Sequence, residues 1–218
     1  MDSYSTAVPV LSYIVTALMA YLLGSIPTGF LVAKARGVDI RTVGSGNIGA
    51  TNAFRVLGKA LGIFVLLMDA LKGWVAVIIG AAVVEALLPG GPPLGYLRIT
   101  AGITAILGHN FTCWLHFKGG KGIATSAGVL IALVPWALII ILSIFIILFL
   151  VTRYVSVGSI AASFSLPFAT WFTTKDVGLT AVTGAMGALA IFKHRKNIQR
   201  LLNGTENRID FHKKEATS

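Results

Sequence analysis

The sequence predicts an all-α polytopic membrane protein, because apolar segments dominate it and charged residues are scarce. Of its 218 residues, 56% are hydrophobic and 12% are charged, and its mean hydropathy is +0.83. A soluble domain carries about 25% charged residues, so the bilayer is the expected solvent. The period-two alternation of a membrane β-barrel is absent, and a lipid-exposed backbone must satisfy its own hydrogen bonds, so the spans are expected to be helices. One integral membrane domain is expected over residues 1–218.

Six apolar segments are candidates for transmembrane helices. They cover residues 9–33, 58–88, 97–115, 123–151, 156–172 and 177–192. The last two are close to the lower limit of about 17 residues for a spanning helix. Pro135 interrupts the fourth segment, which is therefore either one kinked helix or two short ones. The chain has six spans if this segment is continuous and seven if it is divided.

The distribution of basic residues favours seven spans. Lys and Arg gather in loops 34–59 and 116–122 and in the C-terminal tail, whereas loop 89–96 has neither. Cytoplasmic loops are enriched in Lys and Arg. With the N-terminus outside, seven helices place both basic loops and the tail on the cytoplasmic side, whereas six would leave the tail outside. We therefore expect seven transmembrane helices, an outside N-terminus and a cytoplasmic C-terminus with a tail of residues 207–218.

The first basic loop contains a glycine-rich run, GSGNIGATN, at residues 44–52. Its glycines permit positive φ angles, which turn successive N–H groups towards one anion. A helix is expected from Ala50, on which Thr51 and Arg55 share one face. The Arg55 guanidinium could then hold a phosphate with two donors at once. The alternative is a flexible interhelical loop with an arginine that sets the topology.

A second run, GGKG at residues 119–122, immediately precedes an apolar helix that is expected from Ile123. A phosphate there would meet free amides, the positive end of a helix and Lys121 together. The run is not a Walker A loop, because Leu115 occupies the position of the first glycine and Gly122 follows the lysine. ATP hydrolysis is therefore not implied. The alternative is a basic stop between two helices.

Two further polar clusters are expected at the same membrane face. Ser156 and Ser159 begin one helix, where they could act only as caps. His194 and Asn197 lie in a basic cluster after the last span. Such juxtamembrane clusters usually bind lipid headgroups or set the topology, which leaves Asn197 unexplained. The clusters together indicate a membrane enzyme that handles phosphorylated substrates at the boundary between water and lipid.

Taken together, these motifs resemble those of the PlsY family, the acyl-phosphate:glycerol-3-phosphate acyltransferases of bacterial inner membranes. The matching positions are residues 45–52, Arg55, residues 119–125, Ser156, Ser159, residues 194–201, Gly204 and Glu206. The resemblance implies a seven-helix fold in the cell inner membrane with an active site that faces the cytoplasm. It also implies transfer of a fatty acyl group from acyl phosphate to glycerol 3-phosphate. The products would be lysophosphatidic acid and phosphate, in the first step of phospholipid biosynthesis.

The resemblance also carries roles onto individual residues. The catalytic residues it implies are Ser45, Arg55, Lys121, Ser159 and Asn197, with Ser156 close enough to be the alternative to Ser159. The substrate-binding residues expected from the loops are Gly46, Asn47, Thr51, Asn52, Gly119, Gly120, Gly122 and His194. The partners are acyl phosphate, glycerol 3-phosphate and membrane lipid, with a cytosolic acyl-phosphate-forming enzyme as a candidate and no nucleic acid. No cofactor is expected.

The expected mechanism rests on positioning and charge stabilisation. Acyl phosphate is a mixed anhydride with a good leaving group, so no covalent enzyme intermediate is required. Lys121, Arg55 and the loop amides would hold phosphates, while serine and amide side chains orient the attacking hydroxyl. The general base stays open between the donor's own phosphate oxygens, His109 and His194.

Three alternatives concern metals, buried charges and transport. His109 and His116 could share a helix face, but no carboxylate accompanies them, so no metal site is expected. Asp69 and Lys72 lie inside the second span, where they are either functional or a mutual ion pair that holds the bundle together. The alternative function is a small membrane transporter for phosphorylated or anionic solutes. Against transport, the halves show no repeat and the polar groups cluster at one face.

Overall fold

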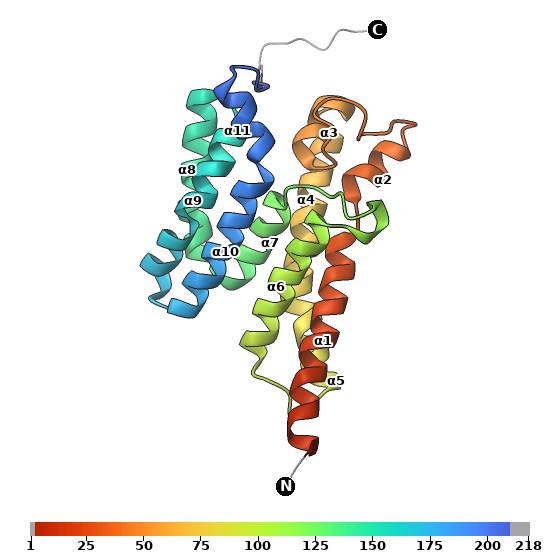
Figure 1. The fold of residues 1–218 in the computed structure, drawn as a ribbon, viewed down its shortest axis with the longest axis vertical. Helices are drawn as coiled ribbons and strands as arrows, with labels where there is room; N and C mark the ends of the chain where they lie inside the picture. The colour runs from red at the N-terminus through yellow and green to blue at the C-terminus, as the bar shows by residue number, and fades with distance from the viewer. Residues whose placement is uncertain (1–2, 210–218) are drawn as a thin grey trace. The chain divides into compact units, whose positions relative to one another are not determined.

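The computed structural model describes residues 3–209, so most of the predicted tail of residues 207–218 lies outside it. All regular structure in this part of the chain is helical, which confirms the all-α fold (Figure 1). The α-helices are α1 (Ser3–Ser25), α2 (Thr28–Lys34), α3 (Ala50–Leu57), α4 (Lys59–Val75), α5 (Ala81–Leu87), α6 (Leu94–Asn110), α7 (Ile123–Leu133), α8 (Pro135–Thr152), α9 (Val155–Thr174), α10 (Val177–Lys193) and α11 (Arg195–Leu202). A π-helical turn, η1 (Ala76–Gly80), joins α4 to α5, and a 3₁₀ turn, η2 (Cys113–Leu115), follows α6.

Four stretches of residues 3–209 are long and apolar enough to cross a membrane. They are Ala7–Lys34, Lys59–Leu87, Pro135–Thr152 and Val155–Thr174. A fifth is added if α10 and α11, which meet at a bend of 54°, are counted as one span. Length and composition therefore support a multi-pass membrane protein with four or five long apolar helices, and the count of seven stays a prediction.

The fourth predicted apolar segment is two helices. α7 ends at Leu133, Val134 leaves the helical region with φ −144° and ψ 64°, and α8 begins at Pro135. A proline disfavours helical geometry in the residue before it and has no N–H to continue a helix. The break therefore follows from Pro135, and the kinked continuous helix is excluded.

Two other predicted helix bounds differ from those observed. The first predicted span, residues 9–33, is interrupted by Ile26 and Pro27, where α1 gives way to α2. The third, residues 97–115, ends early at Asn110, because Phe111 adopts φ −135° and ψ 56°. Hydrophobicity continues through both breaks, which is why composition alone did not reveal them.

The chain divides into two compact units, one up to Pro135 and the other from Trp136. In the first unit α1 lies along α6, and α4 packs against both α3 and α7 (Figure 1). Small residues permit these close approaches: Ala20 and Ala105 are buried between α1 and α6, and a Cβ on Gly108 would overlap the Tyr21 carbonyl. Small residues at helix contacts are typical of membrane bundles.

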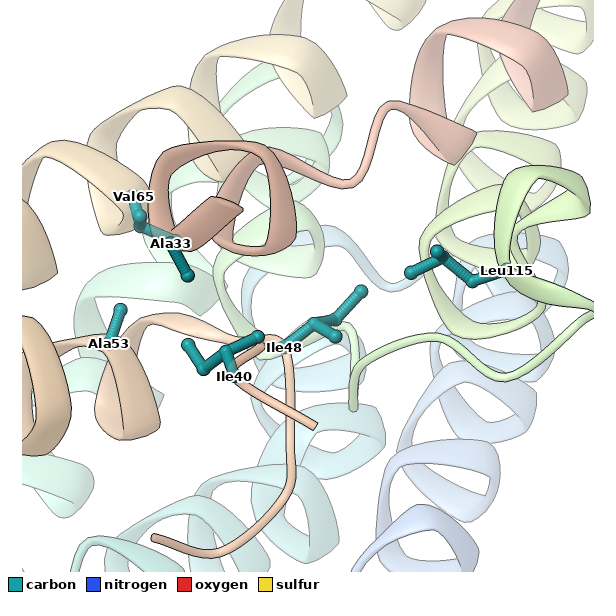
Figure 2. Packing of buried hydrophobic residues seen from close by; sticks show 6 residues of the cluster. All are labelled: Ala33, Ile40, Ile48, Ala53, Val65 and Leu115. Atoms are coloured by element: carbon teal, nitrogen blue, oxygen red, sulfur yellow. The ribbon is translucent and has the colours of Figure 1, made fainter. Parts of the chain in front are cut away.

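A second apolar cluster lies under the loop between α2 and α3. Its members are Ala33, Ile40, Ile48, Ala53, Val65 and Leu115, all buried (Figure 2). Ile40 and Ile48 come from the loop itself, and Figure 2 shows them next to one another. Burying a large aliphatic side chain contributes about 1.5–3 kcal/mol, so these two residues anchor the glycine-rich loop. This packing favours an ordered loop over the predicted alternative of a flexible interhelical loop.

In the second unit α9 and α10 form a helical hairpin (Figure 1). Gly187 of α10 lies against the Ser163 carbonyl of α9, and Gly158 of α9 lies against Phe145 of α8. Asp176 caps α10, accepting a hydrogen bond from the Leu179 N–H at 2.9 Å. This packing fixes the turns that carry the predicted polar residues of this unit.

Candidate active site

Asn52 organises the first glycine loop from its centre. Its side chain is 1% exposed. Its Oδ1 accepts a hydrogen bond from the Ser45 N–H at 2.8 Å, and its Nδ2 donates to the Ile40 and Val43 carbonyls at 3.2 and 3.1 Å. Both ends of the amide are therefore used by the loop's own backbone. We infer that Asn52 shapes the loop, whereas the sequence predicted that it binds substrate.

The loop's glycines are required by its geometry. Gly44 and Gly46 have φ of +61° and +68°, a region that favours glycine. A Cβ on Gly44 would overlap Asn52 Oδ1. Gly49 is instead extended, with φ −81°, and its N–H donates to Asn47 Oδ1 at 2.9 Å, just before α3 begins. The backbone of Ser45 is thus held in one position by its neighbours.

α3 presents the next two candidates. It begins at Ala50 as predicted, and Thr51 and Arg55 are four residues apart on it. Both are half-buried, as are Ser45 and Asn47, whereas Gly46 is exposed. The first loop and α3 therefore offer a hydroxyl, an amide and a guanidinium that remain partly accessible.

The second glycine loop folds back on the C-terminal end of α6. The N–H groups of Gly119 and Gly120 donate to the carbonyls of Asn110 and His109 at 3.3 and 3.0 Å. Gly122 has φ of +81°, and its Cα faces the side-chain oxygen of Asn110. Two amides that sequence reasoning expected to be free for a ligand are thus bonded within the protein. The donors that remain for an anion are those of the first turn of α7, which have no partner within the helix.

Lys121 stands directly before α7 and is half-buried. α7 begins at Ile123 as the sequence predicts. An ammonium group beside a helix N-terminus adds its charge to the positive end of the helix dipole, which favours a phosphate there. The second loop can therefore still bind a phosphate through Lys121 and the start of α7, although the Gly119 and Gly120 amides are bonded within the protein.

In the second unit, three side chains are hydrogen-bonded to Glu206. Its Oε1 accepts hydrogen bonds from Ser156 Oγ at 2.9 Å and Asn197 Nδ2 at 2.7 Å. Its Oε2 lies 2.6 Å from Arg200 Nε. The Glu206 side chain is only 4% exposed. Burial alone would raise the pKa of this carboxyl, but the hydrogen bonds from its partners outweigh that cost and hold its pKa below the ordinary value.

This arrangement distinguishes between the two serines of α9. The Ser156 hydroxyl is engaged by Glu206, and α9 has no side-chain cap, so capping is not the role of Ser156. Ser159 is buried one turn further along α9. Glu206 belongs to the last motif, but no role was predicted for it from the sequence. A carboxylate six residues after an arginine was the only signal in the sequence, and the burial and three partners of Glu206 are visible only in the folded unit.

His194 lies at the corner between α10 and α11. Its ring is buried, and Nδ1 lies 2.8 Å from the Ala190 carbonyl oxygen. Because a carbonyl oxygen only accepts, Nδ1 carries the proton and Nε2 is the nitrogen left for other contacts. Three residues later, Asn197 is buried in the first turn of α11.

The predicted site residues therefore fall into two sets, one in each compact unit. The first unit holds Ser45, Gly46, Asn47, Thr51, Asn52, Arg55, Gly119, Gly120, Lys121 and Gly122. The second holds Ser159, His194 and Asn197. Direct contacts link Ser45 to Asn52 and Asn197, through Glu206, to Ser156. Among the described residues, no group of three or more His, Cys, Asp or Glu side chains could hold a metal ion.

Comparisons with known proteins show the family of the chain. A family model described as glycerol-3-phosphate acyltransferase matches residues 14–204. A glycerol-3-phosphate acyltransferase of Geotalea daltonii is 47% identical over 197 residues, covering 90% of this chain and 97% of the relative. One from Fusobacterium nucleatum is 45% identical over 195 residues, covering 88% and 96%.

Two solved structures have the same fold. Both are crystal structures of PlsY (YgiH), an integral membrane glycerol 3-phosphate acyltransferase. The glycerol 3-phosphate form matches with a TM-score of 0.83 and 38% identity, and the lysophosphatidic acid form with 0.80 and 37%. Each match covers 91% of this chain and 96% of the other.

Proposed function

Because the chain belongs to the glycerol-3-phosphate acyltransferase family, we propose that it transfers a fatty acyl group from acyl phosphate to glycerol 3-phosphate. The products are lysophosphatidic acid and inorganic phosphate. One observation supports the proposal beyond the family: the loop of residues 44–52 is packed through the buried Ile48 and hydrogen-bonded to Asn52, and Ile40 is buried just before it. Such a loop presents Ser45 to a ligand with little loss of entropy on binding.

The reaction needs two phosphorylated substrates held close to each other. Lys121 and Arg55 bind the phosphate groups, with the first amides of α7 as further donors. Ser45, Ser159 and Asn197 orient the attacking hydroxyl. Gly46, Asn47, Thr51 and His194 complete the substrate contacts, and Gly119, Gly120 and Gly122 set the shape of the second loop. Asn52 keeps the structural role that its hydrogen bonds give it.

The chemistry is a direct acyl transfer. A hydroxyl oxygen of glycerol 3-phosphate attacks the acyl carbonyl carbon, the new ester C–O bond forms, and the bond from that carbon to the phosphate oxygen breaks. The hydroxyl proton passes to an oxygen of the leaving phosphate. Fixed cations and amide dipoles around the reacting groups supply the stabilisation, and no covalent intermediate on the protein is needed.

The proposed topology is that of seven transmembrane helices with the N-terminus outside. α6 and α7, in addition to the five long apolar stretches obtained when α10 and α11 count as one span, would complete the count. α7 has 11 residues and is therefore about 17 Å long, so it must lie in a locally thin or protein-lined region. The basic loops and tail would place the active site on the cytoplasmic side of the bacterial inner membrane. There a cytosolic enzyme that forms acyl phosphate could deliver its product.

The donor is tested with purified protein in detergent micelles, supplied with labelled glycerol 3-phosphate and either acyl phosphate or acyl-CoA. We expect labelled lysophosphatidic acid from acyl phosphate, with one phosphate released per acyl group transferred. Product from the thioester alone would overturn the donor assignment. In proteoliposomes, uptake of glycerol 3-phosphate without any acylated product would favour the transporter.

A further inference from the structure

Three ionisable side chains are buried in the first unit, and the proposed chemistry uses none of them. The exposed fractions are 2% for Asp69, 6% for Lys72 and 5% for His109. Asp69 and Lys72 lie in α4 and His109 in the last turn of α6. Burying an ionisable group within the membrane costs free energy, so these three residues are candidates for a functional role.

The three side chains lie close together. Lys72 Nζ lies 2.7 Å from Asp69 Oδ1 and also donates to the Ile26 carbonyl at 2.7 Å. The predicted mutual ion pair is therefore present, and it also joins α4 to the break between α1 and α2. His109 Nδ1 lies 3.6 Å from the same Asp69 oxygen. Within residues 3–209 this nitrogen has no hydrogen-bond partner, and Asp69 is the anion that faces it.

The other side of His109 faces the second glycine loop. A Cβ on Gly120 would overlap His109 Nε2, so the ring packs directly on the Gly120 backbone. The His109 carbonyl accepts the Gly120 N–H at 3.0 Å and lies against Gly119. His109 thus holds the residue before Lys121 with both its ring and its main chain. Since one ring nitrogen faces Asp69 and the other faces Gly120, the ring is enclosed by protein on both sides.

α4 also fixes the chain after Lys121. A Cβ on Gly73, next to Lys72, would overlap the Thr125 carbonyl in the first turn of α7. A Cβ on Gly128 of α7 would likewise overlap the Ala70 carbonyl. α4 therefore supports both ends of the segment that carries Lys121: the start through Asp69 and His109, and the end through Gly73.

We propose that Asp69 and His109 are positioning residues for Lys121: Asp69 orients the His109 ring, and the ring seats the glycine loop so that the ammonium group meets a substrate phosphate. His109 then serves as a support and not as the general base. The inference rests on the proposed phosphate-binding role of Lys121, and every contact it uses lies within the first compact unit.

The test is steady-state acyl transfer from acyl phosphate to glycerol 3-phosphate by full-length His109→Ala, Lys121→Ala and the double variant. For His109→Ala we expect the KM of one phosphorylated substrate to rise about tenfold while kcat changes less than about threefold. Because the residues act through one contact, adding His109→Ala to Lys121→Ala should change kcat/KM by less than about twofold. His109→Asn, which keeps a polar side chain at this position, should recover part of the loss.

His116→Asn is the matched control. His116 is exposed, follows the same helix and has φ of +53°, a conformation that asparagine tolerates. Unchanged kinetics for His109→Ala, or effects of His109→Ala and Lys121→Ala that multiply independently, would overturn the inference alone. Unchanged kinetics for Lys121→Ala would remove the proposed role of Lys121 and the inference with it. If His109→Ala does not fold, Gly120→Ala disturbs the same contact from the loop side and is judged by the same criteria.

Discussion

Single residues in this enzyme owe their roles to buried partners that their sequence neighbours do not reveal. Asn52 and Asn197 both belong to the motifs expected to bind substrate, yet their side chains have different partners. Both the oxygen and the nitrogen of the Asn52 amide are hydrogen-bonded to backbone groups of its own loop. The Asn197 Nδ2 donates a hydrogen bond to Glu206, which also accepts one from Ser156. Motif position alone therefore does not separate a residue that shapes the site from one that contacts the ligand.

Asn52→Ala tests the shaping role. The substitution leaves the Ser45 N–H and two carbonyls without their partner, at a cost of about 1–3 kcal/mol for each buried group left unsatisfied. We expect a lower unfolding temperature and at least about a tenfold loss of kcat/KM. Asn203→Ala, at an exposed asparagine, should change neither quantity. Wild-type stability in the Asn52 variant would show that the loop does not depend on this amide.

Glu206 should make stability depend on pH. Its folded pKa lies below the ordinary value, so the carboxylate stabilises the fold at pH above about 4.5, and this contribution is lost as the pH falls through the folded pKa. Glu206→Gln should therefore be less stable than wild type at pH 7, and the difference should shrink in acid. Denaturant unfolding from pH 7 to pH 3 measures it. The exposed Glu85→Gln is the control, and a difference that stays constant with pH would contradict the assignment.

At the level of the helices, close backbone approaches decide what can be substituted. A Cβ on Gly108 would overlap the Tyr21 carbonyl across the contact between α6 and α1, whereas a Cβ on Gly95 in the same helix would meet open space. Both glycines lie in α6, but Gly108 faces α1 whereas Gly95 faces open space. Steric crowding at a helix contact costs about 1–3 kcal/mol, and an alanine in an open helical position is stabilising by up to about 1 kcal/mol.

Gly108→Ala and Gly95→Ala therefore form a matched pair. Gly108→Ala is expected to lower the unfolding temperature and to weaken catalysis, because it pushes the end of α6 that carries His109 away from α1. Gly95→Ala should leave both unchanged or raise the stability slightly. Thermal unfolding in detergent, monitored by circular dichroism, gives the comparison. Equal stability of the two variants would mean that the contact between α1 and α6 can relax at no cost.

The sequence predicted helix starts better than helix ends. The starts of α3 at Ala50 and α7 at Ile123 follow from glycine-rich loops, and the break before α8 follows from Pro135. The end of α6 at Asn110 lies within a hydrophobic stretch and depends on tertiary hydrogen bonds to the second glycine loop. The site's residue types were likewise predictable, but the roles of Asn52, Glu206 and His109 depend on contacts between segments distant in sequence.

On the scale of the whole molecule, composition predicted the membrane class, and the resemblance of the motifs predicted the family. The helical fold and the family are confirmed, whereas the seven spans and their orientation stay predictions. The positive-inside rule supplies the orientation, because the loops with glycine and lysine alternate with loops that carry at most one basic residue. Each compact unit holds some of the predicted site residues.

Accessibility labelling tests the topology. In a Cys113→Ser background, which removes the chain's single cysteine, new cysteines replace exposed Lys118, Lys196 and Asp176 in turn. A membrane-impermeant thiol reagent applied to intact cells should label the Asp176→Cys variant alone, and permeabilised cells should show all three. Labelling of the Lys118 or Lys196 variant from outside would contradict the proposed orientation.

The most direct measurement of the central claim is kcat/KM for acyl transfer from acyl phosphate to glycerol 3-phosphate by Lys121→Ala and Asn197→Ala. One residue belongs to each compact unit. If both residues serve the acyl transfer as proposed, each substitution should lower kcat/KM by at least about a hundredfold while the protein stays folded. Wild-type kcat/KM in either folded variant would contradict the role proposed for that residue.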